Sequence, residues 1–343
     1  MRLQRRVSRR TLLRGMATAP LAAMLLAACG EPDPSLSTPR VPAGAGPSGS
    51  ILFVAGGNIN NWNGSVNTLT SGFKAAFPSW SPAGDRFAYV KMSDAFSELY
   101  VADRSGKELQ KLTNNEPADA PYTEAFAFNA AWAVDAVWSP TNDQIAFISD
   151  KGGLDPYSDI MYLWFAERWD VQADPYPLLA AQSIDHMQAS PSFSPDGNQI
   201  AFVVRVPISD TVRSTQLWAM DLNGGAYRTL VDGSLGAAYK PAWSPTGDNI
   251  AYVQRTGTSD DIWIVPAHDG GPYQLTHLGT LNAPVWSPDG RFLAFFREQD
   301  GNFEAWYADV TLGADRHVTI GEPKKLFSAD NIDAPSGMSW TAS

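Results

Sequence analysis

Residues 286–296 read WSPDGRFLAFF, and four other stretches of the chain repeat this phrase with small changes. They are WSPAGDRFAYV at 80–90, WSPTNDQIAFI at 138–148, FSPDGNQIAFV at 193–203 and WSPTGDNIAYV at 243–253. The aromatic residues that open the five copies are 58, 55, 50 and 43 residues apart. A period of this size indicates a repeat architecture.

Each copy has the chemistry of a β-hairpin. Proline presets φ at the first corner of a turn, Asp or Asn tolerates the bend, and glycine takes a positive φ. The apolar run that follows is β-branched and aromatic, and it is too short for a helix. Two further apolar stretches complete each repeat, and the last contains one leucine: Leu112, Leu179, Leu230, Leu275 and Leu326. Four antiparallel strands per repeat indicate propeller blades, which bury both faces by stacking around an axis.

The two ends of the chain give the number of blades. Met338-Ser339-Trp340 is a sixth copy of the first strand, whereas Ile51 to Ala55 reads as a second strand that lacks a first. The C-terminal strand is therefore expected to join the N-terminal blade and to close the ring without a free edge. Residues 50–343 supply 49 residues per blade for six blades. We predict an all-β fold, a six-bladed β-propeller of four-stranded antiparallel blades.

Residues 1–29 read as an export signal outside the propeller. Six arginines and no acid precede an Ala/Leu-rich stretch that is short for a membrane span. Arg9 and Arg10 belong to a Ser-Arg-Arg-Thr-Leu-Leu sequence that resembles the twin-arginine export motif. Leu-Ala-Ala-Cys at 26–29 resembles a bacterial lipoprotein cleavage box, which predicts lipid on Cys29. Residues 30–49 are rich in Pro, Gly and Ser and are expected to form a tether.

The charge of the remaining chain restricts its partners. Residues 30–343 hold 19 basic and 36 acidic residues, a formal net charge of −17. Such a charge disfavours nucleic acid and bare anionic membrane. Cys29 is the only cysteine, and several acyl chains on it would anchor the protein durably. We expect a monomer outside the cytoplasm, held by this lipid on the periplasmic face of a membrane or at the cell surface.

The repeats resemble those of the TolB-like family, whose blades carry a Trp-Ser-Pro-Asp-Gly-type phrase in their first hairpin. The resemblance covers residues 50–343, with five copies in order. It implies a six-bladed propeller of the bacterial cell envelope that acts through protein contacts. TolB itself carries an α/β domain ahead of its propeller, and here we expect the tether alone in that place.

No catalytic motif is apparent in the sequence. The chain has neither a Gly-x-Ser-x-Gly nucleophile elbow nor a Gly-rich phosphate loop. Its four histidines, His186, His268, His277 and His317, fall in different blades without metal-ligand spacing, so we predict no metal and no cofactor. The repeated Trp, Ser and Pro are expected to be architectural. The acidic pair Asp260-Asp261 is expected to lie in a solvated turn.

Candidate binding residues precede the innermost strands, because propellers bind ligands at the mouth of the central channel. They are Asp135, His186, Gln188, Tyr239, Lys240, Asn282 and Asp333. Asp135 and Lys240 both lie three residues ahead of the aromatic residue, so we expect them to face the channel and to titrate against each other. The alternative is that all seven are ordinary polar loop residues.

One connection between blades is unusually long. Leu112 and Trp138 are 26 residues apart, against 11 to 14 for the same interval in the other blades. The added segment 116–134 contains Tyr122, Phe126, Phe128 and Trp132. It is either a contact surface on a rim loop or a plug that folds back over its own blade.

The functional prediction is a non-catalytic binding propeller that engages an envelope protein or a peptide through its channel mouth and rim loops. One alternative is a metal-assisted enzyme, a lyase or hydrolase that acts on polysaccharides, for which His186 is the residue to test. The other is a propeller that binds a carbohydrate without turning it over.

Overall fold

The computed structural model describes residues 46–72, 74–119, 121, 123–151, 162–166, 174–178, 186–207, 213–223 and 225–342. The predicted export signal with Arg9 and Arg10, the lipid site Cys29 and residues 30–45 of the tether lie outside these ranges. Residues Pro47–Ser343 form one compact unit. No helix in the described ranges is long and apolar enough to cross a membrane.

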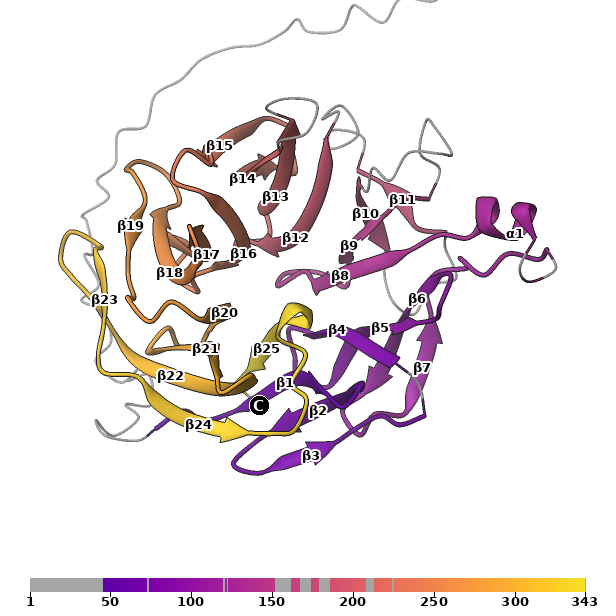
Figure 1. Cartoon of the computed structure of the whole chain (residues 1–343), viewed down its shortest axis with the longest axis horizontal. Helices are drawn as coiled ribbons and strands as arrows, with labels where there is room; N and C mark the ends of the chain where they lie inside the picture. The colour runs from indigo at the N-terminus through magenta and orange to yellow at the C-terminus, as the bar shows by residue number, and fades with distance from the viewer. Residues whose placement is uncertain are drawn as a thin grey trace, which may run out of the picture. The chain divides into compact units, whose positions relative to one another are not determined.

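Six antiparallel sheets are arranged in a ring, which confirms the predicted six-bladed propeller (Figure 1). Blade 1 contains β25 (Met338–Thr341), β1 (Ser50–Ala55), β2 (Asn58–Trp62) and β3 (Val66–Thr68). Blade 2 contains β4 (Lys74–Trp80), β5 (Arg86–Met92), β6 (Ser97–Asp103) and β7 (Glu108–Lys111). Blade 3 contains β8 (Ala133–Trp138), β9 (Ile145–Ser149), β10 (Tyr162–Ala166) and β11 (Tyr176–Pro177).

The other three blades follow in chain order around the ring (Figure 1). Blade 4 contains β12 (Met187–Phe193), β13 (Gln199–Pro207), β14 (Arg213–Asp221) and β15 (Tyr227–Val231). Blade 5 contains β16 (Ala237–Trp243), β17 (Asn249–Thr256), β18 (Ser259–Pro266) and β19 (Tyr273–Gln274). Blade 6 contains β20 (Leu281–Trp286), β21 (Phe292–Gln299), β22 (Asn302–Leu312), β23 (Val318–Ile320) and β24 (Lys324–Ser328).

Blade 6 differs from the predicted pattern by one strand. β22 is 11 residues long, so two short strands share its outer edge. β24 pairs with the first half of β22 and contains the predicted leucine, Leu326. β23 pairs with the second half of β22 and forms an additional hairpin.

The C-terminal strand closes the ring as expected. β25 pairs antiparallel with β1, with Trp340 opposite Ile51. The Trp340 indole N–H donates to the Ser48 carbonyl at 2.9 Å. The Ser339 hydroxyl accepts the backbone N–H of Trp80 in blade 2 at 2.9 Å. The last strand therefore connects blade 1 to blade 2 as well as completing blade 1.

The repeated phrase builds the first hairpin of each blade. In the copy at 286–296, the Ser287 hydroxyl accepts the backbone N–H of Phe292 at 2.9 Å and donates to Asp289 at 2.6 Å. Ser194 makes the equivalent contacts with Gln199 and Asp196, at 2.9 and 2.5 Å. The serine thus joins the turn to the start of the second strand.

Hydrophobic clusters hold neighbouring blades together. Each of six clusters combines buried side chains of two adjacent blades, and the last pair is blade 6 with blade 1. The aromatic residues of the repeated phrase contribute to these clusters; Trp80, for example, is 5% exposed. This contact between sheets explains why the blades need one another for burial.

The long connection between blades 2 and 3 contains a short helix, α1 (Glu124–Asn129). Its N-cap is Thr123, whose side-chain oxygen accepts the backbone N–H of Phe126 at 3.1 Å. Figure 1 shows α1 outside the ring of strands, beyond the start of β8.

Candidate functional site

A bulge recurs on the innermost strand of blades 2 to 6. In blades 2 to 6 the residue three positions ahead of the aromatic residue has φ between 48° and 51°: Phe77, Asp135, Ser190, Lys240 and Ala283. The strand register shifts at each of these places, so two residues oppose one on the neighbouring strand. Gly337 takes the same place in blade 1, with φ 78°. Five non-glycine residues in this rarely occupied conformation place strain at the centre of the ring.

These six residues line a central cavity of about 360 Å³. Proline follows the bulge residue in four blades and also lines the cavity: Pro78, Pro191, Pro241 and Pro284. The Ser-Pro turns of blades 3 to 6 contribute as well, through Pro140, Pro195, Pro245 and Pro288. Proline and aromatic side chains therefore form much of the cavity wall, together with several serines and two charged lining residues, Asp135 and Lys240.

An ion pair crosses the central cavity. The Lys240 ammonium lies 3.1 Å from Asp135 Oδ1, and the two side chains are 20% and 13% exposed. Asp135 Oδ2 accepts the backbone N–H of Ser190 at 2.9 Å and faces the Ser190 hydroxyl at 3.4 Å. The ammonium also lies 5.5 Å from the centre of the Phe77 ring. Residues from blades 2, 3, 4 and 5 therefore meet around this ion pair.

The other five predicted channel residues do not belong to the lining of this cavity: His186, Gln188, Tyr239, Asn282 and Asp333. Gln188 is 1% exposed, and its side-chain oxygen accepts the Leu163 backbone N–H at 3.0 Å. Tyr239 lies beside the Arg255–Asp260 ion pair, with Arg255 5.6 Å from its ring centre. Burial and the Asp260 carboxylate raise the pKa of the Tyr239 hydroxyl. Gln188 thus joins blade 4 to blade 3, whereas Tyr239 contacts residues of its own blade.

The remaining three predicted channel residues lie at separate places in the propeller. The Asp333 carboxylate accepts the Ser336 hydroxyl at 2.6 Å, at the start of the 3-10 helix η1 (Ala334–Ser336). The side-chain oxygen of Asn282 is buried and has no hydrogen-bond partner among the described residues. His186 is half-buried just before β12.

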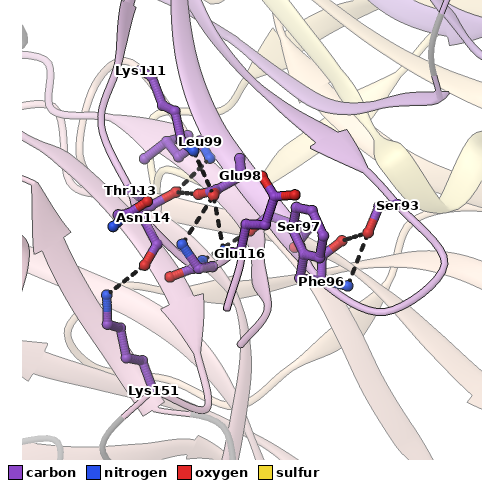
Figure 2. Close-up of polar contacts among 11 residues, drawn as sticks. Ser93, Phe96, Ser97, Glu98, Leu99, Lys111, Thr113, Asn114, Glu116 and Lys151 are labelled. Carbon is purple, nitrogen blue, oxygen red and sulfur yellow. Dashed lines mark hydrogen bonds and ion pairs between the residues drawn. The ribbon is translucent and has the colours of Figure 1, made fainter. Parts of the chain in front are cut away.

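Both ends of the long insertion are attached to the start of β6. Figure 2 shows the Glu98 carboxylate at the centre of this network, contacted by Lys111 and Thr113. Glu98 is 3% exposed and accepts the backbone N–H groups of Asn115 at 2.9 Å and Glu116 at 3.1 Å. Burial by itself lowers the pKa of Lys111, but the hydrogen bond to Glu98 and the nearby negative charges together outweigh burial and raise the pKa of the lysine.

The aromatic residues of the insertion are only partly described. Tyr122 and the side chain of Phe128 lie outside the described residues. Phe126 is half-buried in α1, and Trp132 is half-buried, with its backbone N–H donating to Asp150 at 2.7 Å. At the exit of the insertion, Ala133 N–H donates to the Ser97 hydroxyl at 2.7 Å. The base of the insertion is thus firmly hydrogen-bonded to its blade.

Two of the four histidines lie beside one cavity of about 300 Å³ in blades 5 and 6. His268 and His317 line it together with Tyr273, whose ring stacks on His317 at 4.1 Å between centroids. Sequence spacing did not indicate that these histidines come together. No group of three or more His, Cys, Asp or Glu residues in the described ranges could hold a metal ion.

Residues 179–330 match the TolB β-propeller domain. This match spans blades 4 to 6. No curated protein matches the sequence. Among solved structures, TolB from Acinetobacter baumannii is similar, with a TM-score of 0.61 and 17% identity; the match covers 85% of this chain and 66%, just under two thirds, of that TolB chain.

Two other solved structures are similar over most of the propeller. A chain of a nidogen–laminin complex has a TM-score of 0.58 and 10% identity, covering 85% of this chain and 98% of that chain. An oligogalacturonate lyase in complex with manganese has a TM-score of 0.50 and 12% identity, covering 81% of this chain and 74% of that chain. At these identities the similarities establish the fold alone, because one fold serves many functions.

Proposed function

We propose that this TolB-like propeller is a non-catalytic binding module of the bacterial cell envelope that engages a protein or peptide through its central cavity. The observation that carries the proposal is the Asp135–Lys240 pair in the central cavity of about 360 Å³, whose wall is rich in proline. An ammonium has three N–H donors, so Lys240 retains donors for a ligand carbonyl or carboxylate beside its contact with Asp135. Proline and aromatic walls suit the apolar part of a peptide.

A photo-crosslinking probe in the cavity tests this proposal in intact cells. Phe77 lines the cavity, and p-benzoylphenylalanine in its place keeps an aromatic ring there. We expect a discrete crosslinked product from position 77, identified by mass spectrometry. We expect Lys240→Met to reduce the yield about tenfold, because one charge-assisted hydrogen bond to the ligand is lost.

The control places the same probe at Tyr227, which is 49% exposed on β15 and does not belong to the cavity lining. A product specific to position 77 supports a ligand in the central cavity. Identical products from positions 77 and 227, or none from position 77, would contradict the proposal.

We further propose that the propeller works outside the cytoplasm, held to a membrane by lipid on Cys29. The sequence of residues 26–29 and the paired Arg9 and Arg10 support this placement. Cys29→Ala is expected to move most of the protein from the membrane fraction to the soluble extracytoplasmic fraction, measured by immunoblotting after fractionation. Cys29→Ser serves as a second variant of similar size. Unchanged membrane association of both variants would show that lipid on Cys29 is not the anchor.

A further inference from the structure

In blade 2, one lysine of the blade pairs with a buried carboxylate and a second lysine lies over an aromatic ring. Lys91 on β5 lies opposite Glu98 on β6, and Tyr100 on β6 lies opposite Lys111 on β7. The Lys111 ammonium pairs with Glu98 at 2.8 Å (Figure 2). The Lys91 ammonium lies 4.3 Å from the centre of the Tyr100 ring. Two internal cations thus occupy the space over one acid and one ring.

Blade 6 repeats this arrangement with different residues. Arg297 on β21 lies opposite Glu304 on β22, and Trp306 lies opposite Lys325 on β24. The Lys325 ammonium pairs with Glu304 at 2.5 Å, and the Arg297 guanidinium lies 5.0 Å from the centre of the Trp306 ring. The same four positions again carry one acid, one aromatic ring and two cations.

Blade 5 keeps the acid and the ring but has no cation at these positions. Asp261 and Trp263 on β18 correspond to Glu98 and Tyr100, while the two cation positions hold Gln254, opposite Asp261, and Gln274, opposite Trp263. Asp261 is 6% exposed, so the expectation of a solvated turn residue is wrong for it. Its Oδ1 accepts the Thr276 hydroxyl and two backbone N–H groups, and none of the described salt bridges includes it.

A cavity of about 640 Å³ lies over these blade 5 residues. Asp261, Trp263 and both glutamines line it, with Leu235 and Leu278 as apolar walls. Gln254 is fully buried, and its side-chain oxygen has no hydrogen-bond partner among the described residues. A buried acceptor without a donor is costly, and a ligand that supplies a donor removes that cost.

We infer that this blade 5 cavity, formed around Asp261 and Trp263, binds an organic cation, a primary ammonium on an aliphatic chain such as that of lysine. The carboxylate of Asp261 and the ring of Trp263 receive the charge, as Glu98 and Tyr100 do in blade 2. The Gln254 oxygen accepts a second N–H, and Leu235 and Leu278 contact the methylene groups. The site is separate from the central cavity and does not depend on the function proposed for it.

The test is a titration of the purified protein, labelled with 5-fluorotryptophan, with Nα-acetyl-lysine amide. Fluorine NMR reports on Trp263, whose resonance is identified by its absence in Trp263→Phe. We expect saturable movement of this resonance with the lysine amide and none with Nα-acetyl-norleucine amide, which lacks the ammonium. Asp261→Asn retains an acceptor for Thr276 and is expected to weaken binding about tenfold or more.

A second variant reproduces the internal cation of blades 2 and 6. Gln274→Lys places an ammonium next to Asp261 and is expected to abolish binding of the lysine amide without loss of thermal stability. Gln299→Lys adds the same charge at an exposed end of β21 and is expected to leave binding unchanged. Equal responses to the lysine and norleucine amides, no response to the lysine amide, or unaltered binding by Gln274→Lys would overturn the inference.

Discussion

Deletion of residues 338–343 is expected to prevent the propeller from folding into a stable ring. The deletion removes β25, which pairs with β1 along four residue pairs and carries the buried Trp340. Removing a buried tryptophan alone costs about 3–5 kcal/mol. The unpaired edge of β1 and the lost contact of Ser339 with Trp80 add to that cost. The sum approaches the whole stability of an ordinary domain, about 5–15 kcal/mol.

Circular dichroism during thermal unfolding and size-exclusion chromatography measure this effect. The truncated chain is expected to aggregate or to melt without a cooperative transition. A chain that ends at Ala342 retains all of β25 and is expected to behave like the full chain. Trp340→Ala should give an intermediate result, a folded protein with a lower melting temperature. A truncated chain that melts cooperatively at the temperature of the full chain would contradict closure by β25.

The fold was predictable because the information for it is local and repeated. The turn chemistry of the Ser-Pro phrase specifies a hairpin wherever it occurs, and the structure places such a hairpin at Ser194 and Ser287. The spacing of the copies then specifies the number of blades. The additional strand β23 was not predictable from the repeat, because it depends on the unusual length of β22.

The site was less predictable because of the bulges. Asp135 and Lys240 were identified by their common position ahead of the aromatic residue, and the structure brings them together. Side chains of a strand alternate between its two faces, and each bulge interrupts this alternation with one extra residue. The face of a side chain ahead of the bulge therefore cannot be assigned from the alternation alone. Tyr239, directly ahead of Lys240, illustrates this effect, since it lies beside Arg255.

A sequence signal for the missed lining residues was nevertheless present. Proline follows the bulge residue in Phe77-Pro78, Ser190-Pro191, Lys240-Pro241 and Ala283-Pro284. This dipeptide recurs at the same distance ahead of the aromatic residue in four blades and marks the channel. The group of four residues without a cation in blade 5, in contrast, could be recognised only from the strand register, because its members come from three strands.

Glu98→Ala is expected to lower the free energy of unfolding by about 2–4 kcal/mol, since removing one partner of a buried charged network leaves the others unsatisfied. The variant leaves the Thr113 hydroxyl, the backbone N–H groups of Asn115 and Glu116, and the Lys111 ammonium without their acceptor (Figure 2). Lys111 keeps 36% of its side chain exposed, so water compensates part of its loss. Urea denaturation followed by circular dichroism measures the change.

Two further variants separate the charge of Glu98 from its hydrogen bonds. Glu98→Gln keeps an oxygen for the backbone N–H groups of Asn115 and Glu116 and is expected to cost about 1 kcal/mol. Lys111→Met removes the cation but leaves the hydrogen bonds from Thr113, Asn115 and Glu116 to the Glu98 carboxylate, so it should cost less than Glu98→Ala. Hydrogen exchange at the amides of Asn115 and Glu116 should accelerate strongly in Glu98→Ala and little in Lys111→Met, because the carboxylate attaches the start of the insertion to β6. Equal urea midpoints for Glu98→Ala and Glu98→Gln would show that these backbone hydrogen bonds do not hold the insertion.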